Sequence, residues 1–197
     1  MAERRIARMG QPILQEVAER VKDPGEPWVQ ELVRDMIDTM YAAPGIGLAA
    51  PQVFVPYRVI VFHIPPTRQY QEETGEDGHP ADGVPVTTLI NPAFEPLDPR
   101  QDDGQEGCLS IPDLIGQVPR YRRIRYWGTT PDGRVVGGAA SGLHARVVQH
   151  EIDHLDGVLY PERMTDMSTL AFASELAEIA EAAARSDVGE GDTSDAA

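Results

Sequence analysis

The sequence contains a single cysteine, Cys108, so no disulfide bond can form within the 197-residue chain. A lone thiol is typical of proteins from a reducing compartment. No run of about 18 consecutive apolar residues is present, so the sequence predicts no membrane-spanning helix. The first residues lack the charged, apolar and small-residue progression of a secretory signal. We therefore expect a soluble, cytoplasmic protein without a membrane partner.

Basic residues are also scarce, with 17 Lys and Arg against 32 Asp and Glu and a formal net charge of -15. This balance argues against a broad electrostatic surface for nucleic acid, and we predict no direct nucleic-acid binding. Residues 65–105 hold nine acids and two arginines, and residues 165–197 hold eight acids and one arginine. The remaining sequence is almost neutral, so we assign the acidity to one loop region and the C-terminal tail.

The length suits a single domain with one core. Apolar spacing predicts two helical turns within residues 13–21, a helix over residues 27–41, and an amphipathic C-terminal helix over residues 168–184 that packs on the domain. Runs rich in β-branched and aromatic residues predict strands at residues 58–64, 87–91 and 120–127. This mixture predicts one domain of helices and strands over residues 1–185.

Two acidic segments and one arginine-rich segment need separate interpretation. Residues 65–85 are rich in Pro, Gly, Glu and Asp, which indicates an exposed insertion, and residues 186–197 hold too few apolar residues to fold. In the strand predicted at residues 120–127, four arginines alternate imperfectly with aromatic and apolar residues. We interpret these arginines as a solvated strand face rather than a nucleic-acid strip, because the wider surface is acidic.

The most informative stretch is a His-Glu-x-x-His pattern formed by His150, Glu151 and His154. On a helix, residues four apart lie on the same face, so both imidazoles can reach one metal ion while Glu151 stands beside it. The apolar residues around the motif place the histidines at the edge of a core: Leu143, Val147, Val148, Leu155 and Val158. Buried histidines need partners, and a divalent cation is favoured over backbone carbonyls.

A catalytic metal usually has three protein ligands and a water, so one ligand must come from elsewhere. Cys108 is the only thiol and lies in a glycine-flanked turn rather than in an apolar run. Glu175 is the alternative, because some metallopeptidases with this helix motif take a third ligand downstream. Residues 44–52 form a loop of small, uncharged residues, which either lies against a ligand or makes a tight connection.

Three stretches together resemble the signature motifs of the peptide deformylase family, in the family's order. They are GIGLAAPQ from Gly45, EGCLS from Glu106 and QHEIDHLDG from Gln149. The similarity extends over about residues 5–165. It implies an α+β fold in which mostly antiparallel sheets surround a central metal-binding helix, followed by a C-terminal helix. It also implies hydrolysis of the N-formyl group from the N-terminal formylmethionine of new proteins.

The resemblance implies a role for each matching residue. Cys108, His150 and His154 would hold the metal with water at the fourth position. Glu151 would act as general base and then as acid, while Gln52 and the main-chain amide of Leu109 would form an oxyanion hole. Ile46, Gly47 and Gly107 would bond the substrate through their main chains. Separately from the resemblance, Leu143 and Val147 precede His150 on its helix face, so we expect them to line an adjoining pocket for an unbranched apolar side chain such as methionine. The expected ion is Fe²⁺, for which Zn²⁺, Ni²⁺ or Co²⁺ can substitute.

Three features depart from the family pattern. The insertion at residues 65–85 is longer than in the simplest members, and Ile115 stands where many members have a substrate-anchoring arginine. The C-terminal helix, which is basic in some members that dock on ribosomes, is acidic here, and this argues against ribosome association through that helix. Two other functions are compatible with the His-Glu-x-x-His motif. One is a metallo-endopeptidase with Glu175 or Glu162 as third ligand, and the other is a binding module with a closed structural metal site.

Overall fold

The computed structural model describes residues 2–66 and 83–189 and contains two antiparallel sheets. The larger sheet has the strand order β1-β2-β3-β6-β7, and the smaller has the order β4-β5-β8. The strands of the larger sheet are β1 (Gly47–Ala49), β2 (Val59–Ile64), β3 (Val84–Pro96), β6 (Arg123–Thr129) and β7 (Val135–Ser141). Those of the smaller sheet are β4 (Gln101–Cys108), β5 (Ile111–Tyr121) and β8 (Ala171–Phe172). The predicted α+β fold class is confirmed.

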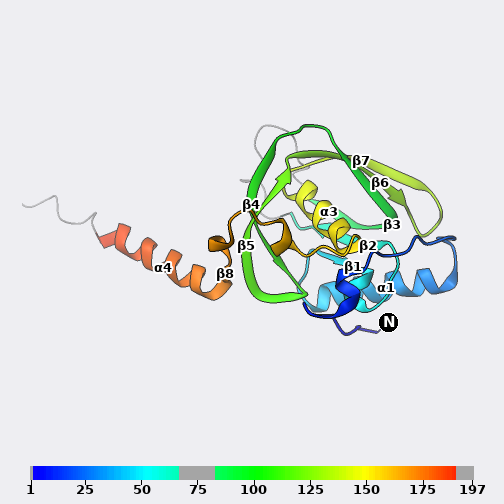
Figure 1. Cartoon of the computed structure of the whole chain (residues 1–197), viewed down its shortest axis with the longest axis horizontal. Helices are drawn as coiled ribbons and strands as arrows, with labels where there is room; N and C mark the ends of the chain where they lie inside the picture. The colour runs from blue at the N-terminus through cyan, green and yellow to red at the C-terminus, as the bar shows by residue number, and fades with distance from the viewer. Residues whose placement is uncertain (1, 67–82, 190–197) are drawn as a thin grey trace, which may run out of the picture.

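The α-helices of the described residues are α1 (Pro27–Ala42), α3 (Gly142–Leu155) and α4 (Ala173–Gly189). The 3-10 turns are η1 (Pro12–Gln15), η2 (Ala50–Val53), η3 (Tyr160–Arg163) and η4 (Met167–Thr169). Figure 1 shows α3 at the centre of the molecule, enclosed by strands of both sheets. No helix within the described ranges is long and apolar enough to span a membrane.

Strand β2 is buried on both faces, which explains why all its residues except the half-buried His63 are apolar. Its residues Ile60, Phe62 and Ile64 belong to the core cluster that contains Val148 and Ile152 of α3. The alternate residues, Val59 and Val61, belong to a second cluster with Val29, Leu32, Met36 and Met40 of α1. Because successive side chains point to opposite faces of a strand, α3 and α1 lie on opposite faces of the sheet.

Helix α1 follows the sequence prediction closely. It begins at Pro27, where a proline needs no amide partner, and it buries Leu32, Met36 and Met40 as expected from their spacing. The predicted strands at residues 58–64 and 87–91 are also confirmed, although β3 begins earlier, at Val84, and continues to Pro96. Residues 67–82 of the predicted insertion lie outside the described residues.

The helix predicted within residues 13–21 is wrong. Only the single turn η1 forms, Val17 is 71% exposed, and Glu19 instead pairs with Tyr57 in a parallel bridge. The amide of Ala18 donates to the carbonyl of Leu155 at 2.8 Å. The main chain of these residues therefore forms hydrogen bonds with neighbouring elements instead of the bonds within a helix. A helix of two turns is too short to be stable alone, so the extended conformation is favoured.

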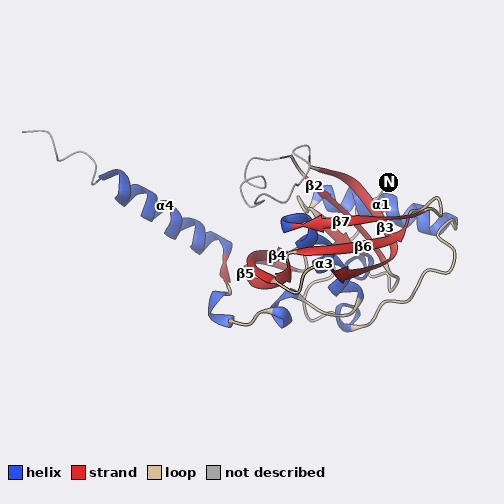
Figure 2. Cartoon of the chain, turned by 90° about the horizontal axis from the view of Figure 1, so that it is seen from above, coloured by secondary structure: helices blue, strands red, loops and turns tan. Residues whose placement is uncertain are grey.

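The strand predicted at residues 120–127 is two strands, because β5 ends at Tyr121 and β6 begins at Arg123. The C-terminal helix is also corrected. It begins at Ala173, continues to Gly189 and extends away from the body, as Figures 1 and 2 show, instead of packing on it. Ile179, on its predicted inner face, is 65% exposed. Three of the six residues predicted on that face are alanines, namely Ala173, Ala180 and Ala183, and they offer too little apolar area to hold the helix against the domain. The unfolded tail predicted from residue 186 is wrong for residues 186–189, which continue α4, and residues 190–197 lie outside the described residues.

Candidate metal and active site

Helix α3 positions the three polar residues of the His-Glu-x-x-His motif in the protein interior. His150, Glu151 and His154 are 9%, 4% and 1% exposed. The apolar neighbours Val148 and Ile152 hold this part of the helix in the core below the larger sheet. The rings of His150 and His154 approach edge to face with centroids 4.9 Å apart, so one helical turn presents both imidazoles to the same point.

Cys108, at the end of β4, joins the two histidines. Its sulfur lies 3.2 Å from Nε2 of His154, and the ligand atoms of Cys108, His150 and His154 all lie within 4.8 Å of one another. The other two candidates for third ligand lie elsewhere: Glu175 is on the projecting helix α4, and Glu162 accepts a hydrogen bond from the amide of Leu159 at 2.9 Å. A thiolate and two imidazoles are a donor set suited to a tetrahedral divalent ion with one open position.

The charge balance of this cluster also suits a cation. Burial opposes ionisation of the Cys108 thiol, but the adjacent His154 and His150 outweigh it and hold the thiol pKa well below its usual range. Burial likewise opposes protonation of His150, but the Cys108 sulfur and Glu106 carboxylate raise the His150 pKa well above normal. The anionic sulfur therefore favours positive charge on the His150 imidazole, and a metal ion can supply that charge instead.

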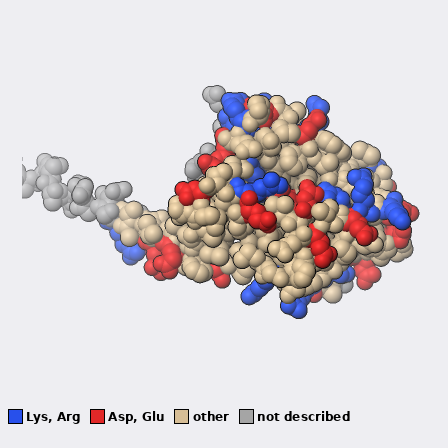
Figure 3. Space-filling view, viewed as in Figure 1, with Lys and Arg blue, Asp and Glu red and all other residues tan. Residues whose placement is uncertain are grey.

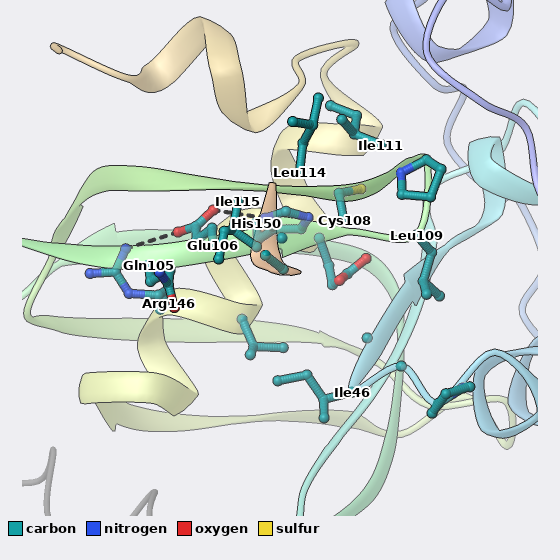
Figure 4. A pocket seen from close by; sticks show the side chains of 18 of the residues that line it. Ile46, Gln105, Glu106, Cys108, Leu109, Ile111, Leu114, Ile115, Arg146 and His150 are labelled. Atoms are coloured by element: carbon teal, nitrogen blue, oxygen red, sulfur yellow. Dashed lines mark hydrogen bonds and ion pairs between the residues drawn. The ribbon is translucent and has the colours of Figure 1, made fainter. Parts of the chain in front are cut away.

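Glu106 fixes the orientation of His150. Its Oε2 lies 2.8 Å from Nδ1 of His150, which leaves Nε2 of that ring directed at the cluster. The same carboxylate accepts two hydrogen bonds from Arg120, at 2.8 and 2.9 Å, and one from Arg146 at 2.9 Å. Figure 4 shows the Arg146, Glu106 and His150 side chains in line along one wall of the cavity. Burial opposes ionisation of Glu106, but Arg120 and His150 outweigh it and hold the Glu106 pKa far below normal, so this carboxylate stays charged.

Arg120 extends this network to the far side of α3. It is 5% exposed and pairs with Asp153 at 2.5 Å, and Asp153 also accepts from Arg163 at 2.8 Å. The predicted solvated arginine face is therefore wrong for Arg120, which is the buried link between β4 and α3. Sequence reasoning assigned no role to Arg120 or Glu106. Their positions in the sequence could have indicated a role near the site, because Glu106 stands two residues before Cys108 and Arg120 ends the Val-Pro-Arg segment.

Glu151 lies against the main chain of Gly47. A β-carbon built on Gly47 would come within 2.2 Å of Oε1 of Glu151, so only glycine permits this approach. Oε2 of Glu151 is buried and has no hydrogen-bond partner among the described residues. Burial raises the pKa of Glu151 to about 7, although His150 and His154 oppose the shift. A carboxyl group with this pKa can take up and release a proton near neutral pH.

The side-chain amide of Gln52 is oriented toward the same cluster. The amide of Ala49 donates to Oε1 of Gln52 at 2.8 Å, which directs Nε2 to the other side. Nε2 donates to the Ser110 hydroxyl at 3.1 Å and to the Cys108 sulfur at 3.5 Å. A fixed N–H donor therefore faces the place where the ligand atoms meet.

A cavity of about 590 Å³ opens over the cluster, between the free edges of β1 and β4. It is lined by every residue predicted for the site except His154, which is buried behind it: Ile46, Gly47, Gln52, Gly107, Cys108, Leu109, Leu143, Val147, His150 and Glu151. Ile115 and Ala173 also line it. Figure 4 shows Ile46 on one side of this cavity and Cys108, Leu109 and Ile115 on the other. A groove between two unpaired strand edges can accept an extended peptide.

Comparison with known sequences shows the family to which this chain belongs. The sequence model of the polypeptide deformylase family matches residues 3–169. The chain belongs to the peptide deformylase family. Peptide deformylase 2 of Ralstonia nicotianae is 46% identical over 173 residues, which are 88% of this chain and 93% of the relative.

Solved structures agree with the sequence match. A peptide deformylase from Ehrlichia chaffeensis superposes with a TM-score of 0.75 and 30% identity, over 85% of this chain and 91% of the other. A class I type b peptide deformylase from Acinetobacter baumannii, bound to Met-Ala-Ser, gives a TM-score of 0.72 and 33% identity over 83% and 99%. Deformylases are metal-dependent enzymes that remove the N-formyl group from nascent chains, and family membership favours this activity over the endopeptidase and binding-module alternatives.

Proposed function

We propose that this chain hydrolyses the N-formyl group of formylmethionyl polypeptides, releasing formate, with an ion held by Cys108, His150 and His154. The observation that carries the proposal is the convergence of one thiol from β4 with two imidazoles from α3 beneath a peptide-sized cleft. Such an ion would supply Lewis-acid polarisation and make a water molecule acidic enough to lose a proton near neutral pH.

The substrate docks as an extended strand between β1 and β4. The main chains of Ile46, Gly47 and Gly107 lie on the two walls of the cavity and can bond a peptide on both sides. Leu143 and Val147, which precede the histidines on α3, line an apolar space for the methionine side chain. The Met-Ala-Ser peptide bound to the Acinetobacter relative is consistent with such a ligand. Ile115 offers no charge to anchor the peptide, so main-chain bonds must hold it.

Glu151 moves the protons. It accepts one from the attacking water and returns it to the leaving nitrogen, for which its buried position and pKa of about 7 are suited. The Gln52 amide and the Leu109 main-chain N–H donate to the formyl oxygen as negative charge develops on it. Removing one donor of this kind typically costs about 2.7 to 4 kcal/mol of barrier.

The ion is proposed to be Fe²⁺, with Zn²⁺, Ni²⁺ or Co²⁺ able to substitute. A thiolate beside ferrous iron is exposed to oxygen chemistry, so the iron form should lose activity in air as Cys108 is oxidised. Iron-loaded samples kept with and without oxygen, compared with a zinc-loaded sample, test this. Equal rates of inactivation in the two iron samples would contradict it.

Ribosome association is not proposed through α4. The described part of this helix carries three glutamates on its exposed surface, and Figure 3 shows acidic side chains where it leaves the body. Like charge on RNA disfavours such a contact. Cosedimentation with ribosomes at low salt should leave the protein in the supernatant, and a pellet that is lost on deletion of α4 would contradict this expectation.

The central experiment is metal analysis of anaerobically purified protein alongside formate release from formyl-Met-Ala-Ser. We expect close to one ion per chain and turnover, both lost in Cys108→Ala. Glu175→Ala and Glu162→Ala are matched controls that should keep both. Metal retained in Cys108→Ala but lost in Glu175→Ala would favour the endopeptidase alternative, and a bound ion without an exchangeable water would favour a structural site.

A further inference from the structure

A second groove, of about 760 Å³, opens beside the catalytic cleft. The lining of this groove includes Arg4, Arg5 and Arg8 from the N-terminal segment. It also includes Ala42 and Ala43 at the end of α1, and Leu109. Leu109 also lines the catalytic cavity. The two hollows are therefore neighbours across one side chain.

The groove is locally cationic in a strongly acidic protein. Arg4 forms an ion pair with Asp35, whose Oδ2 lies 2.9 Å from Nη2 and 3.0 Å from Nε of the arginine. Arg5 and Arg8 are exposed, and neither forms an ion pair with the described residues. Arg5 stacks over the ring of Phe54, with the guanidinium carbon 5.3 Å from the ring centre. Although Glu3 contributes one carboxylate to the groove, two unpaired guanidinium groups remain to attract an anion.

The main chain fixes these arginines relative to the active site. The amide of Ala7 donates to the carbonyl of Gln52 at 2.7 Å, and the amide of Met9 donates to the carbonyl of Ser110 at 2.8 Å. The N-terminal segment is thus bonded to both loops that flank Cys108. Arg5 and Arg8, on either side of buried Ala7, are carried on a backbone with a defined position.

The direction of the substrate leads it toward this groove. The formyl end must lie near Glu151, which contacts Gly47. A peptide that pairs with the edge of β1 then runs past Ile46 and Gly45 toward Pro44, away from the cluster. Residues 43–46 form the turn that joins α1 to β1. Within this turn Gly45 lies against Leu109, because a β-carbon built on Gly45 would come within 2.8 Å of Cδ1 of the leucine. A peptide that passes Gly45 therefore reaches Leu109, the side chain shared by the two grooves, after about four residues. Ala43 lines the second groove.

We propose that Arg5 and Arg8 bind acidic side chains of the nascent chain from about its fourth residue onward, so that the enzyme favours substrates with acidic downstream segments. The inference rests on the proposed function and adds a charge preference to it. Continuity with the cleft through Leu109 favours the substrate itself as the occupant. A nucleic acid would meet a chain whose formal net charge is -15.

Three substrates test the preference. They are formyl-Met-Ala-Ser, which ends before the groove, and two extensions of it that continue with Ala-Glu-Glu-Glu or with Ala-Lys-Lys-Lys. We expect a lower KM for the acidic extension than for the basic one, with similar kcat, because the contact lies away from the reacting atoms. Exposed ion pairs contribute up to roughly a five-fold change in affinity each, and added salt should reduce the difference.

Charge reversal makes the test sharper. The double variant Arg5→Gln/Arg8→Gln should lose the difference between the extended substrates, and Arg5→Glu/Arg8→Glu should favour the basic one. The matched control is Arg20→Gln/Arg123→Gln, which removes two exposed arginines outside the groove and should keep the wild-type preference. Unchanged turnover of formyl-Met-Ala-Ser in every variant shows that the active site is intact.

The outcomes separate this proposal from the proposed function. If formyl-Met-Ala-Ser is hydrolysed but the acidic extension gives no lower KM, the groove proposal is wrong and the deformylase activity stands. An equal loss of preference in the control pair would mean that overall charge, not this groove, sets it. If wild-type protein with bound metal releases no formate from any of the three substrates, the proposed function itself fails.

Discussion

Helices α3 and α4 contrast in a way that hydrophobic pattern does not anticipate. Helix α3 is rich in polar side chains, yet His144, Gln149, Asp153 and the three residues of its motif are all buried. Helix α4 has an apolar stripe, yet Ile179 in that stripe is 65% exposed and the helix extends away from the body (Figure 2). A polar helix therefore forms the centre of this molecule and an amphipathic one lies outside it.

The two helices differ in burial because they have different hydrogen-bond and ion-pair partners. Gln149 exchanges hydrogen bonds with both main-chain groups of Tyr121, at 3.0 and 3.1 Å, and Asp153 pairs with Arg120 and Arg163. Each buried polar group of α3 that is satisfied in this way avoids the cost of desolvation without a partner. The alanines in the apolar stripe of α4 gain little free energy from burial, so α4 lacks a comparable reason to pack on the domain.

The largest expected effect comes from removing the proton carrier of α3. Glu151→Gln should reduce formate release from formyl-Met-Ala-Ser by about 10²- to 10⁴-fold, because a positioned general base and acid contributes that much. The variant should keep its metal by elemental analysis. The matched change on α4, Glu175→Gln, should leave the rate unchanged. Comparable losses in both variants would erase the functional contrast between the two helices.

The next effect concerns the buried ion network beneath α3. Arg120→Met leaves the carboxylates of Glu106 and Asp153 without their shared partner, and breaking a buried pair costs about 3 to 5 kcal/mol of unfolding free energy. Urea unfolding measures this cost. The counterpart on α4, Arg185→Met, removes an exposed contact to Glu181 and should leave the midpoint unchanged. A small change in Arg120→Met would show that the network contributes little to folding.

The smallest effects compare one isoleucine from each helix. Ile152→Ala in α3 should lower the unfolding free energy by about 2 to 5 kcal/mol, because the side chain is only 4% exposed. Ile179→Ala in α4 should stay within about 0.5 kcal/mol. Thermal and urea unfolding of both variants provide the comparison. A large loss in Ile179→Ala would indicate that α4 packs against something in solution.

Much of the site could be predicted from local sequence. The spacing of His150 and His154 determines that they share a helix face, and the start of α1 at Pro27 follows from proline's missing amide. The spacing of apolar residues gave a wrong prediction where the main chain found hydrogen-bond partners in distant segments. At residues 13–21 the spacing of apolar residues suited a helix, but Leu155 and Tyr57 supplied bonds to an extended chain.

By itself, the sequence determined the helix that carries two imidazoles and a carboxylate, because a 3.6-residue turn is a local property. Residue spacing left the third ligand open between Cys108 and Glu175, and only the family resemblance favoured Cys108. The tertiary structure brings Cys108 beside His154, because this contact depends on how β4 packs against α3. It also decided that Arg120 is buried. Whether a charged side chain lies in solvent or in a core depends on partners brought from elsewhere in the chain, here Glu106 and Asp153.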